Sequence, residues 1–265
     1  MTARPVTTTD LWKLVGLVLV LIDHWGLLFA DDPSWRVLGR AAAPIFFFFI
    51  GLARTRRVPW SWVVLGLVLT AVESWTSGTG LGKINLNILI NFAFVRLLLP
   101  EVERRVMPHP WAIALLAVAI VLLIRPFQQI MEYGAEGWLW ALFGLSQRMY
   151  VDGRSPDTSD DNLLKRTLTR AGLLRLAACV LAAVIYVGQE QIEFKFNVDQ
   201  SRVFIFGLIV LTVCMCLFWR GPSRFQPPAF LTGPVQFVGR HTLAIYAITL
   251  AAFEIIVKLF PDLAA

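Results

Sequence analysis

Residues 11–30 read LWKLVGLVLVLIDHWGLLFA, an apolar run interrupted by three ionisable side chains, Lys13, Asp23 and His24. An α-helix of this length crosses the roughly 30 Å hydrocarbon core of a bilayer. No small-residue cleavage site follows the run, so we expect it to remain in the protein and not to be removed as a signal peptide. The run therefore predicts a transmembrane helix with polar groups at membrane depth.

The composition of the whole chain agrees with this interpretation. Of the 265 residues, 57% are hydrophobic and 16% are charged, against about 25% charged residues in a typical soluble domain. A chain with 19 Phe and 10 Trp is also too apolar to be disordered. The net charge of +6 fits basic loops that face anionic lipid. We expect no nucleic-acid partner, because no basic run is interleaved with aromatic residues.

Eight further apolar runs resemble the first one in length, and Gly, Pro or charge clusters separate them. Strands would span lipid only in a closed barrel with an alternating pattern, which these runs lack. We therefore predict an all-α, polytopic membrane bundle of about nine transmembrane helices, with residues 1–265 forming one integral-membrane domain. The nine expected helices cover residues 11–30, 35–53, 58–76, 84–100, 110–127, 131–150, 171–189, 201–219 and 235–260.

Basic residues in the predicted loops indicate the orientation of the bundle. Thirteen of them lie on the side that holds the N-terminus, and four lie on the opposite side. Because Lys and Arg are enriched in cytoplasmic loops, we predict a cytoplasmic N-terminus. Loop 152–170 is then cytoplasmic, and the acidic loop 189–200 is extracytoplasmic.

Ionisable residues inside the predicted helices are functional candidates, because a charge at membrane depth costs at least about 2.5–3.5 kcal/mol. Following each helix in its predicted direction places them in two layers. The outer layer holds Asp23, His24, Arg40, Glu73, Lys83, Asn85, Asn87, Arg125, Glu132, Tyr133 and Glu136. The inner, mostly cationic layer holds Lys13, Arg96, Arg175, Arg240 and His241.

The pair Asp23-His24 carries the clearest chemical signal. A histidine has an unperturbed pKa near 6.5, which suits a general base. Asp23 or Glu73 could orient the imidazole, as an acidic residue orients the base of a catalytic triad. Two alternatives are that Arg40 neutralises Asp23 and that these groups form a buried polar network that only joins helices.

Lys13 and His24 lie eleven residues apart, close to three helical turns, so they share one helix face about 16 Å apart along the axis. A cation near the cytoplasm and a base deep in the membrane suit a long ligand with an anionic head, such as acyl-coenzyme A. The alternative is that Lys13 extends to the lipid headgroups.

Several motifs resemble those of the TraX family. Leu11–Gly26 resembles its opening helix with an IDHxG core, and Trp35–Phe48 resembles its R-x-x-G-R-x-A-x-P-x-F stretch. Arg54–Arg57 resembles the family's T-R-N-type turn, and Glu132–Gly137 is similar to its D/E-Y-G-x-x-G segment. Arg240–Leu250 is similar to its closing helix.

The resemblance implies an integral-membrane acyltransferase of the bacterial inner membrane, with acetyl-CoA as the acyl donor. The family is linked to acetylation of pilin N-termini, and the wider transmembrane acyltransferase class also modifies glycans, so the acceptor would be an extracytoplasmic protein or glycan. His24 would be the general base. The expected catalytic residues are His24, Asp23, Arg40 and Glu73; the expected coenzyme A ligands are Lys13, Arg96, Arg240 and His241; the expected acceptor ligands are Asn87, Glu132 and Tyr133.

The sequence departs from the pattern of the wider class at two positions. Lys13 replaces an Arg in the Arg-x10-His spacing that many members share, which keeps the charge but loses a bidentate fork. A His that relatives often carry near Thr249 is missing.

Two other functions are consistent with the same ionisable residues. A proton-coupled transporter would use Asp23, His24 and Glu73 as a relay, and a non-catalytic subunit of an envelope or secretion complex would not need His24. Three Cys inside apolar runs predict buried packing and neither a metal site nor disulfides. The stretch 77–83 lacks the P-loop pattern and predicts a turn.

Overall fold

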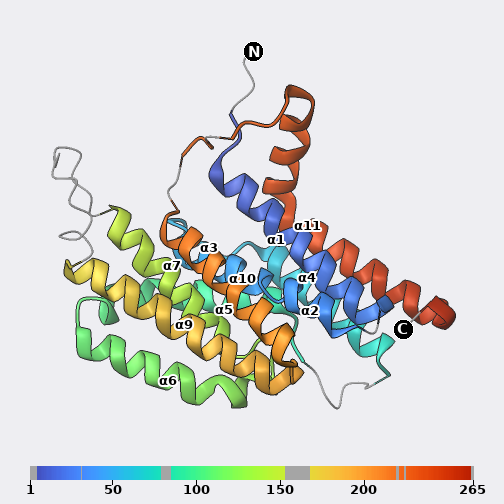
Figure 1. Ribbon diagram of the computed structural model, residues 1–265, viewed down its shortest axis with the longest axis horizontal. Coiled ribbons are helices and arrows are strands. Elements are labelled where there is room, and N and C mark those ends of the chain that lie inside the picture. The colour runs from blue at the N-terminus through green and yellow to red at the C-terminus, as the bar shows by residue number, and fades with distance from the viewer. Residues whose placement is uncertain are drawn as a thin grey trace. The chain divides into compact units, whose positions relative to one another are not determined.

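The computed structural model describes residues 5–30, 32–78, 85–152, 168–218, 221–223 and 225–263 (Figure 1). Most of these residues are helical, and backbone pairing of the β type among them is confined to two isolated bridges. The all-α prediction is confirmed. The helices are α1 (Thr8–Trp25), α2 (Pro33–Gly39), α3 (Ala42–Leu52), α4 (Trp60–Thr76), α5 (Ile88–Glu101), α6 (Pro110–Gln128), α7 (Glu136–Asp152), α9 (Arg170–Phe194), α10 (Val198–Cys216) and α11 (Ala229–Leu259).

Six helical segments within the described residues are long and apolar enough to cross a membrane, and α4 is a shorter apolar helix. α5 and α7, which form in the predicted runs 84–100 and 131–150, have 14 and 17 residues. The protein is therefore a multi-pass helical membrane protein, while the orientation of its N-terminus stays a prediction. The six segments are Thr8–Ala30, Pro33–Leu52, Pro110–Gln128, Arg170–Phe194, Val198–Cys216 and Ala229–Leu259.

The predicted helix 35–53 is divided into α2 and α3 at Arg40 and Ala41. Pro44 explains the break, because a proline ring clashes with the carbonyl four residues earlier and supplies no N–H to it. In α3 the same proline lies in the first turn, where proline is tolerated. Arg40 consequently lies at the end of a short helix and not inside a continuous one.

Three other sequence expectations need correction. Glu132 and Tyr133 were expected to open a helix, but they lie in a turn before α7 in which Tyr133 has a φ of 62°. The stretch 189–200 was expected to be a loop, but α9 extends into it as far as Phe194, and α10 begins in it at Val198. Cys214 was expected to be buried and is exposed on α10, whereas Cys179 is buried.

The chain forms two compact units, and the first comprises Met1–Phe46, Val64–Ile84 and Phe194–Ala265. In this unit α1 packs against α11 and α2, and α10 packs against α2. α11 lies beside α1 (Figure 1). A capping box between Thr7 and Asp10 begins α1 and satisfies backbone N–H groups at its start. The unit therefore has α1 at its centre, which is the helix that carries Lys13, Asp23 and His24.

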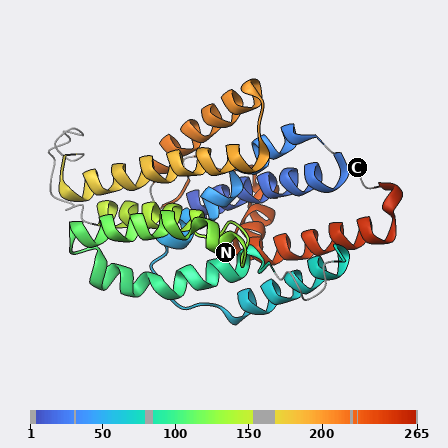
Figure 2. The same cartoon turned by 90° about the horizontal axis from the view of Figure 1, so that it is seen from below.

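The second unit comprises Phe47–Val63 and Asn85–Glu193. Its core is aromatic and includes Phe47, Phe92, Trp140 and Phe143, each at most 1% exposed. α6 packs along α7 in this unit (Figure 2). Residues 47–52 of α3 cross α7 so closely that a Cβ on Gly144 would overlap the carbonyl oxygen of Phe48. The glycine is therefore needed for the contact between these two helices.

Substitution of Gly144 tests this close crossing. Gly144→Ala should lower the free energy of unfolding by about 1–3 kcal/mol, because the added methyl group forces apart two backbones in a packed core. Gly207→Ala is the matched control, because a Cβ there meets no atom within 4 Å. Thermal unfolding of the purified protein in detergent measures both, and equal stability of the two variants would contradict the packing argument.

An ion-pair cluster lies after α5 in the second unit. Glu103 accepts a hydrogen bond from Arg148 and a second one, 2.9 Å long, from Arg56. The hydrogen bond from Arg148 is the main cause that lowers the pKa of Glu103 below its usual value, and Arg56 adds to it. Ionised Glu103 therefore joins α7 to the segment before α4.

The lowered pKa of Glu103 predicts an acid-sensitive part of the stability. A depressed carboxyl pKa contributes stability above the unfolded-state pKa, about 4.3 for Glu, and this contribution disappears as the pH falls through the folded-state value. Glu103→Gln should therefore reduce the loss of thermal stability between neutral and acidic pH. Glu193→Gln, at an exposed position, is the control and should keep the wild-type pH profile.

Candidate functional site

The first unit contains a buried charge cluster formed by α1 and α2. Asp23 is 4% exposed, and its Oδ2 atom lies 3.4 Å from a guanidinium nitrogen of Arg36 and 3.8 Å from one of Arg40. The two arginines lie four residues apart, so they project from the same side of α2 toward α1. Two guanidinium groups thus share the carboxylate of Asp23.

Two neighbours determine the shape of this cluster. A Cβ on Gly39 would overlap the backbone of Asp23, so only glycine permits α2 to approach α1 this closely. The ring of Phe194 lies against both guanidinium groups, with its centroid 4.9 Å from the Arg36 carbon and 4.8 Å from the Arg40 carbon. Cation–π contact with one ring therefore holds both arginines beside their shared carboxylate.

His24 lies directly beside the cluster. Asp23, Arg36 and Arg40 are close enough to act on it electrostatically, and its ring centroid is 5.9 Å from that of Tyr246 on α11. The Nδ1 atom of His24 is buried and has no hydrogen-bond partner in the structure, and the same is true of Asp23 Oδ1. A buried ring nitrogen without a partner can accept a proton from a bound group.

Lys13 lies on the same helix, and its ammonium group donates a 3.0 Å hydrogen bond to the carbonyl of Gly239. α11 is kinked at His241, whose φ of −110° and ψ of 15° are not helical. Asp10 fills the space beside Gly239, where a Cβ would meet its carboxylate. The structure thus brings Lys13 to the chain segment that holds Arg240 and His241, both of which are exposed.

Glu73 is half-buried on α4. One turn later Thr76 donates a 2.7 Å hydrogen bond to Glu254, and its carbonyl accepts one from Lys258. The end of α4 therefore meets α11 near the C-terminal end of that helix. Glu73 therefore belongs to the first unit, which also contains His24. The ion pairs of Asp23 are with Arg36 and Arg40 and not with Glu73.

The predicted acceptor ligands lie in the second unit and bind one another. Glu132 accepts hydrogen bonds from the Asn87 side chain at 3.3 Å and from the Ile88 backbone at 3.0 Å. Asn91 donates to the carbonyls of Glu132 and Gly134, which holds the turn containing Tyr133. In these contacts Glu132 and Asn87 join the turn to the start of α5.

Arg96 also lies in the second unit. It donates hydrogen bonds to the carbonyl and hydroxyl oxygens of Thr55 at 2.9 and 2.7 Å. Its guanidinium lies over the ring of Trp62, 4.9 Å from the centroid. The structure therefore groups Arg96 with Thr55 and Trp62, and it groups Lys13 with Gly239.

Arg36, Gly39 and Phe194 are site residues that the sequence analysis did not select. Arg36 was counted among the loop cations that determine topology. The i, i+4 spacing of Arg36 and Arg40 was the available signal, since such residues share a helix face. Gly39 and Phe194 could not be found in this way, because their role depends on contacts between segments far apart in the sequence.

Comparisons with known proteins agree on one family. The family model described as TraX protein matches residues 8–150. A Protein TraX of Escherichia coli is 30% identical over 187 residues, and one of Escherichia coli strain K12 is 29% identical over 185 residues. Each similarity covers 66% of this chain, which spans 63% of the length of these relatives. No solved structure matches.

Substitution of Asp23 tests the balance of charge in the cluster. Asp23→Asn removes the carboxylate that Arg36 and Arg40 share and should cost about 3–5 kcal/mol of stability. Arg36→Gln should cost less, because Arg40 still neutralises Asp23. Thermal unfolding of the two variants measures the difference, and a larger loss for Arg36→Gln would show that the carboxylate is not the shared partner.

Proposed function

Because the chain belongs to the TraX family, we propose that it is an integral-membrane acyltransferase that transfers an acetyl group from acetyl-CoA. The acceptor is an amine or hydroxyl group presented on the extracytoplasmic side of a bacterial inner membrane, either the N-terminus of a protein such as pilin or a glycan. The observation that carries this proposal is the buried Nδ1 atom of His24, which has no hydrogen-bond partner and lies beside the guanidinium groups of Arg36 and Arg40.

The proposed reaction uses the two features of this site in one step. His24 accepts the proton of the acceptor N–H or O–H as the acceptor atom attacks the thioester carbonyl carbon. Negative charge develops on the carbonyl oxygen, and the guanidinium groups of Arg36 and Arg40 stabilise it. The carbon–sulfur bond then breaks, and the proton held by His24 passes to the departing thiolate. No covalent acyl-enzyme is needed.

The donor is proposed to bind along α1. Lys13, which the Gly239 carbonyl holds against α11, supplies positive charge for the phosphates of coenzyme A. Arg240 and His241 follow Gly239 directly and are exposed, so they extend the same cationic surface. The eleven residues between Lys13 and His24 separate these groups by about 16 Å along the helix axis, which suits an extended pantetheine arm.

Acetyl transfer by the purified protein tests this function. His24→Gln should lower the rate of transfer from labelled acetyl-CoA by roughly 10²–10⁴-fold, the usual contribution of a general base. His109→Gln is the matched control, because His109 lies before α6 in the second unit and outside the proposed site. Candidate acceptors are a pilin N-terminal peptide and an amino sugar.

Two results would contradict the proposal. Normal transfer by His24→Gln would exclude His24 as the base, and failure of the wild-type protein to bind acetyl-CoA would exclude the acyltransferase itself. The second result combined with proton-coupled flux in proteoliposomes would favour a transporter.

A further inference from the structure

The second unit contains a cluster of three arginines, which we call the arginine cluster. Arg96 and Arg148 are buried and Arg56 is half-buried. Arg148 pairs with Glu103, and a guanidinium nitrogen of Arg56 lies 2.9 Å from the same carboxylate. Arg96 donates to Thr55 and is close enough to Arg56 for their charges to repel. The side chains of Arg56 and Arg148 are 16% and 9% exposed.

Among the described residues, the arginine cluster has fewer carboxylates than guanidinium groups. Glu103 lies within ion-pair distance of Arg56 and Arg148, and no carboxylate of the described residues lies within that distance of Arg96, so the cluster has three guanidinium groups and one carboxylate. The Nε atoms of Arg56 and Arg96 are buried and have no hydrogen-bond partner. Buried charge of one sign is costly unless a counter-ion pairs with it. Glu103 is 39% exposed, which leaves the cluster accessible to an anion from the surface.

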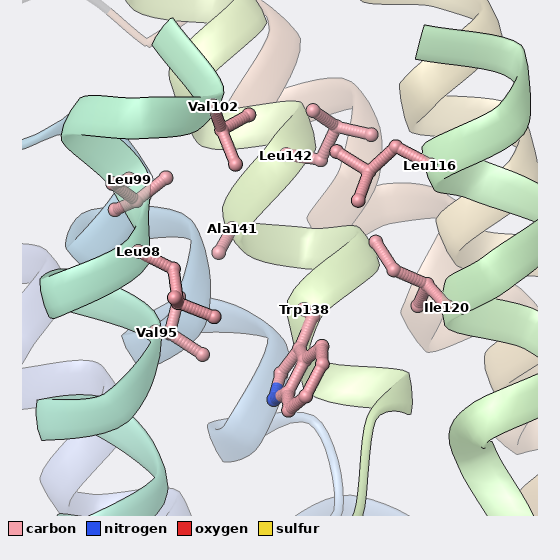
Figure 3. A pocket seen from close by; sticks show the side chains of 9 residues that line it. All are labelled: Val95, Leu98, Leu99, Val102, Leu116, Ile120, Trp138, Ala141 and Leu142. Carbon is pink, nitrogen blue, oxygen red and sulfur yellow. The ribbon is translucent and has the colours of Figure 1, made fainter. Parts of the chain in front are cut away.

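An apolar groove lies in the same unit between α5, α6 and α7 (Figure 3). It has a volume of about 80 Å³. Its wall consists of aliphatic side chains and one indole, whose N–H already donates to Asn91. The lining residues are Val95, Leu98, Leu99, Val102, Leu116, Ile120, Trp138, Ala141 and Leu142.

The groove leads toward the arginine cluster. In Figure 3 Trp138 lies at one end of the groove, and Val102 lies near the other with Leu142. Val102 directly precedes Glu103, and Leu142 lies six residues before Arg148, about 9 Å along α7. Leu116 and Ile120 lie near the middle of α6, which is long and apolar enough to span the membrane. The groove is therefore at hydrocarbon depth, and the arginine cluster is at the end of the helices.

From this arrangement we infer that the second unit binds an anionic phospholipid, with its phosphate at the arginine cluster and one acyl chain in the groove. An acyl chain needs only apolar contact, which is what the groove offers. The pantetheine arm of coenzyme A carries two amides, which would lose their hydrogen bonds in this groove at a cost of about 1–3 kcal/mol each. Arginine forks match phosphate oxygens and leave no buried N–H unpaired.

Binding of two lipids to the full-length protein tests this inference. Dioleoylphosphatidylglycerol and dioleoylphosphatidylcholine are titrated separately into the purified chain in detergent, and bound lipid is counted by native mass spectrometry. The phosphatidylglycerol should bind more tightly and should stay bound at higher activation energy. Equal binding of the two lipids would overturn the inference.

Two pairs of variants locate the lipid. Arg56→Gln should weaken phosphatidylglycerol binding roughly tenfold, because it removes one charge-assisted contact to phosphate. Arg57→Gln changes the same net charge at the exposed neighbouring position and should leave binding unchanged. Leu116→Trp fills the groove and should also weaken binding, while Leu115→Trp, at a position 61% exposed on the same helix, should not.

Size-exclusion chromatography and thermal unfolding show whether each variant folds. If one variant does not fold, the other pair still tests the inference. Unchanged phosphatidylglycerol binding in folded Arg56→Gln or in folded Leu116→Trp would overturn the inference. Displacement of the bound phosphatidylglycerol by palmitoyl-CoA would do the same, because it would assign the groove and the arginine cluster to a coenzyme A thioester.

Discussion

The pairing of Asp23 with Arg36 and Arg40 is the constraint on which the first unit depends. An ionised carboxylate inside a membrane helix is too costly to leave without a partner. The partners must come from a second helix at very short range, which requires Gly39 at the crossing point. The break at Arg40 and Ala41 ends α2 at the point where its two arginines have reached Asp23. Residues 36–44 therefore bring two guanidinium groups to one buried carboxylate.

This pairing also separates the roles of Asp23 and His24. An Asp-His pair in a sequence favours the interpretation that the acid orients the base, as in a catalytic triad. In the structure the carboxylate faces two arginines, and the buried Nδ1 atom of His24 has no partner. Asp23 thus acts on His24 through its charge and not through a hydrogen bond. The geometry fits the interpretation in which arginine neutralises Asp23 better than the one in which Asp23 orients His24. The acid therefore reduces the positive charge that the two arginines place beside the base.

Local patterns predicted the helices well, because apolar length is a property of each segment alone. The apolar runs gave the correct class and the approximate bounds of most helices. The errors arose where a distant residue decides the local structure. Asn91 holds the turn that contains Tyr133 through two carbonyls, so the apolar run 131–150 begins its helix later than its composition indicates. Polar Glu190 resembles a loop residue, yet it is buried inside α9.

The candidate site was predictable only as far as it lies on one helix. Lys13, Asp23 and His24 belong to α1, so their separation along the axis follows from helix geometry. Their partners on α2, α9 and α11 depend on tertiary contacts that no spacing rule contains. A donor held at Lys13 and a base at His24 are joined by one continuous helix, so the distance between them is maintained without any contribution from the second unit. That unit can therefore bind lipid at its own site while α1 alone maintains the spacing that the reaction requires.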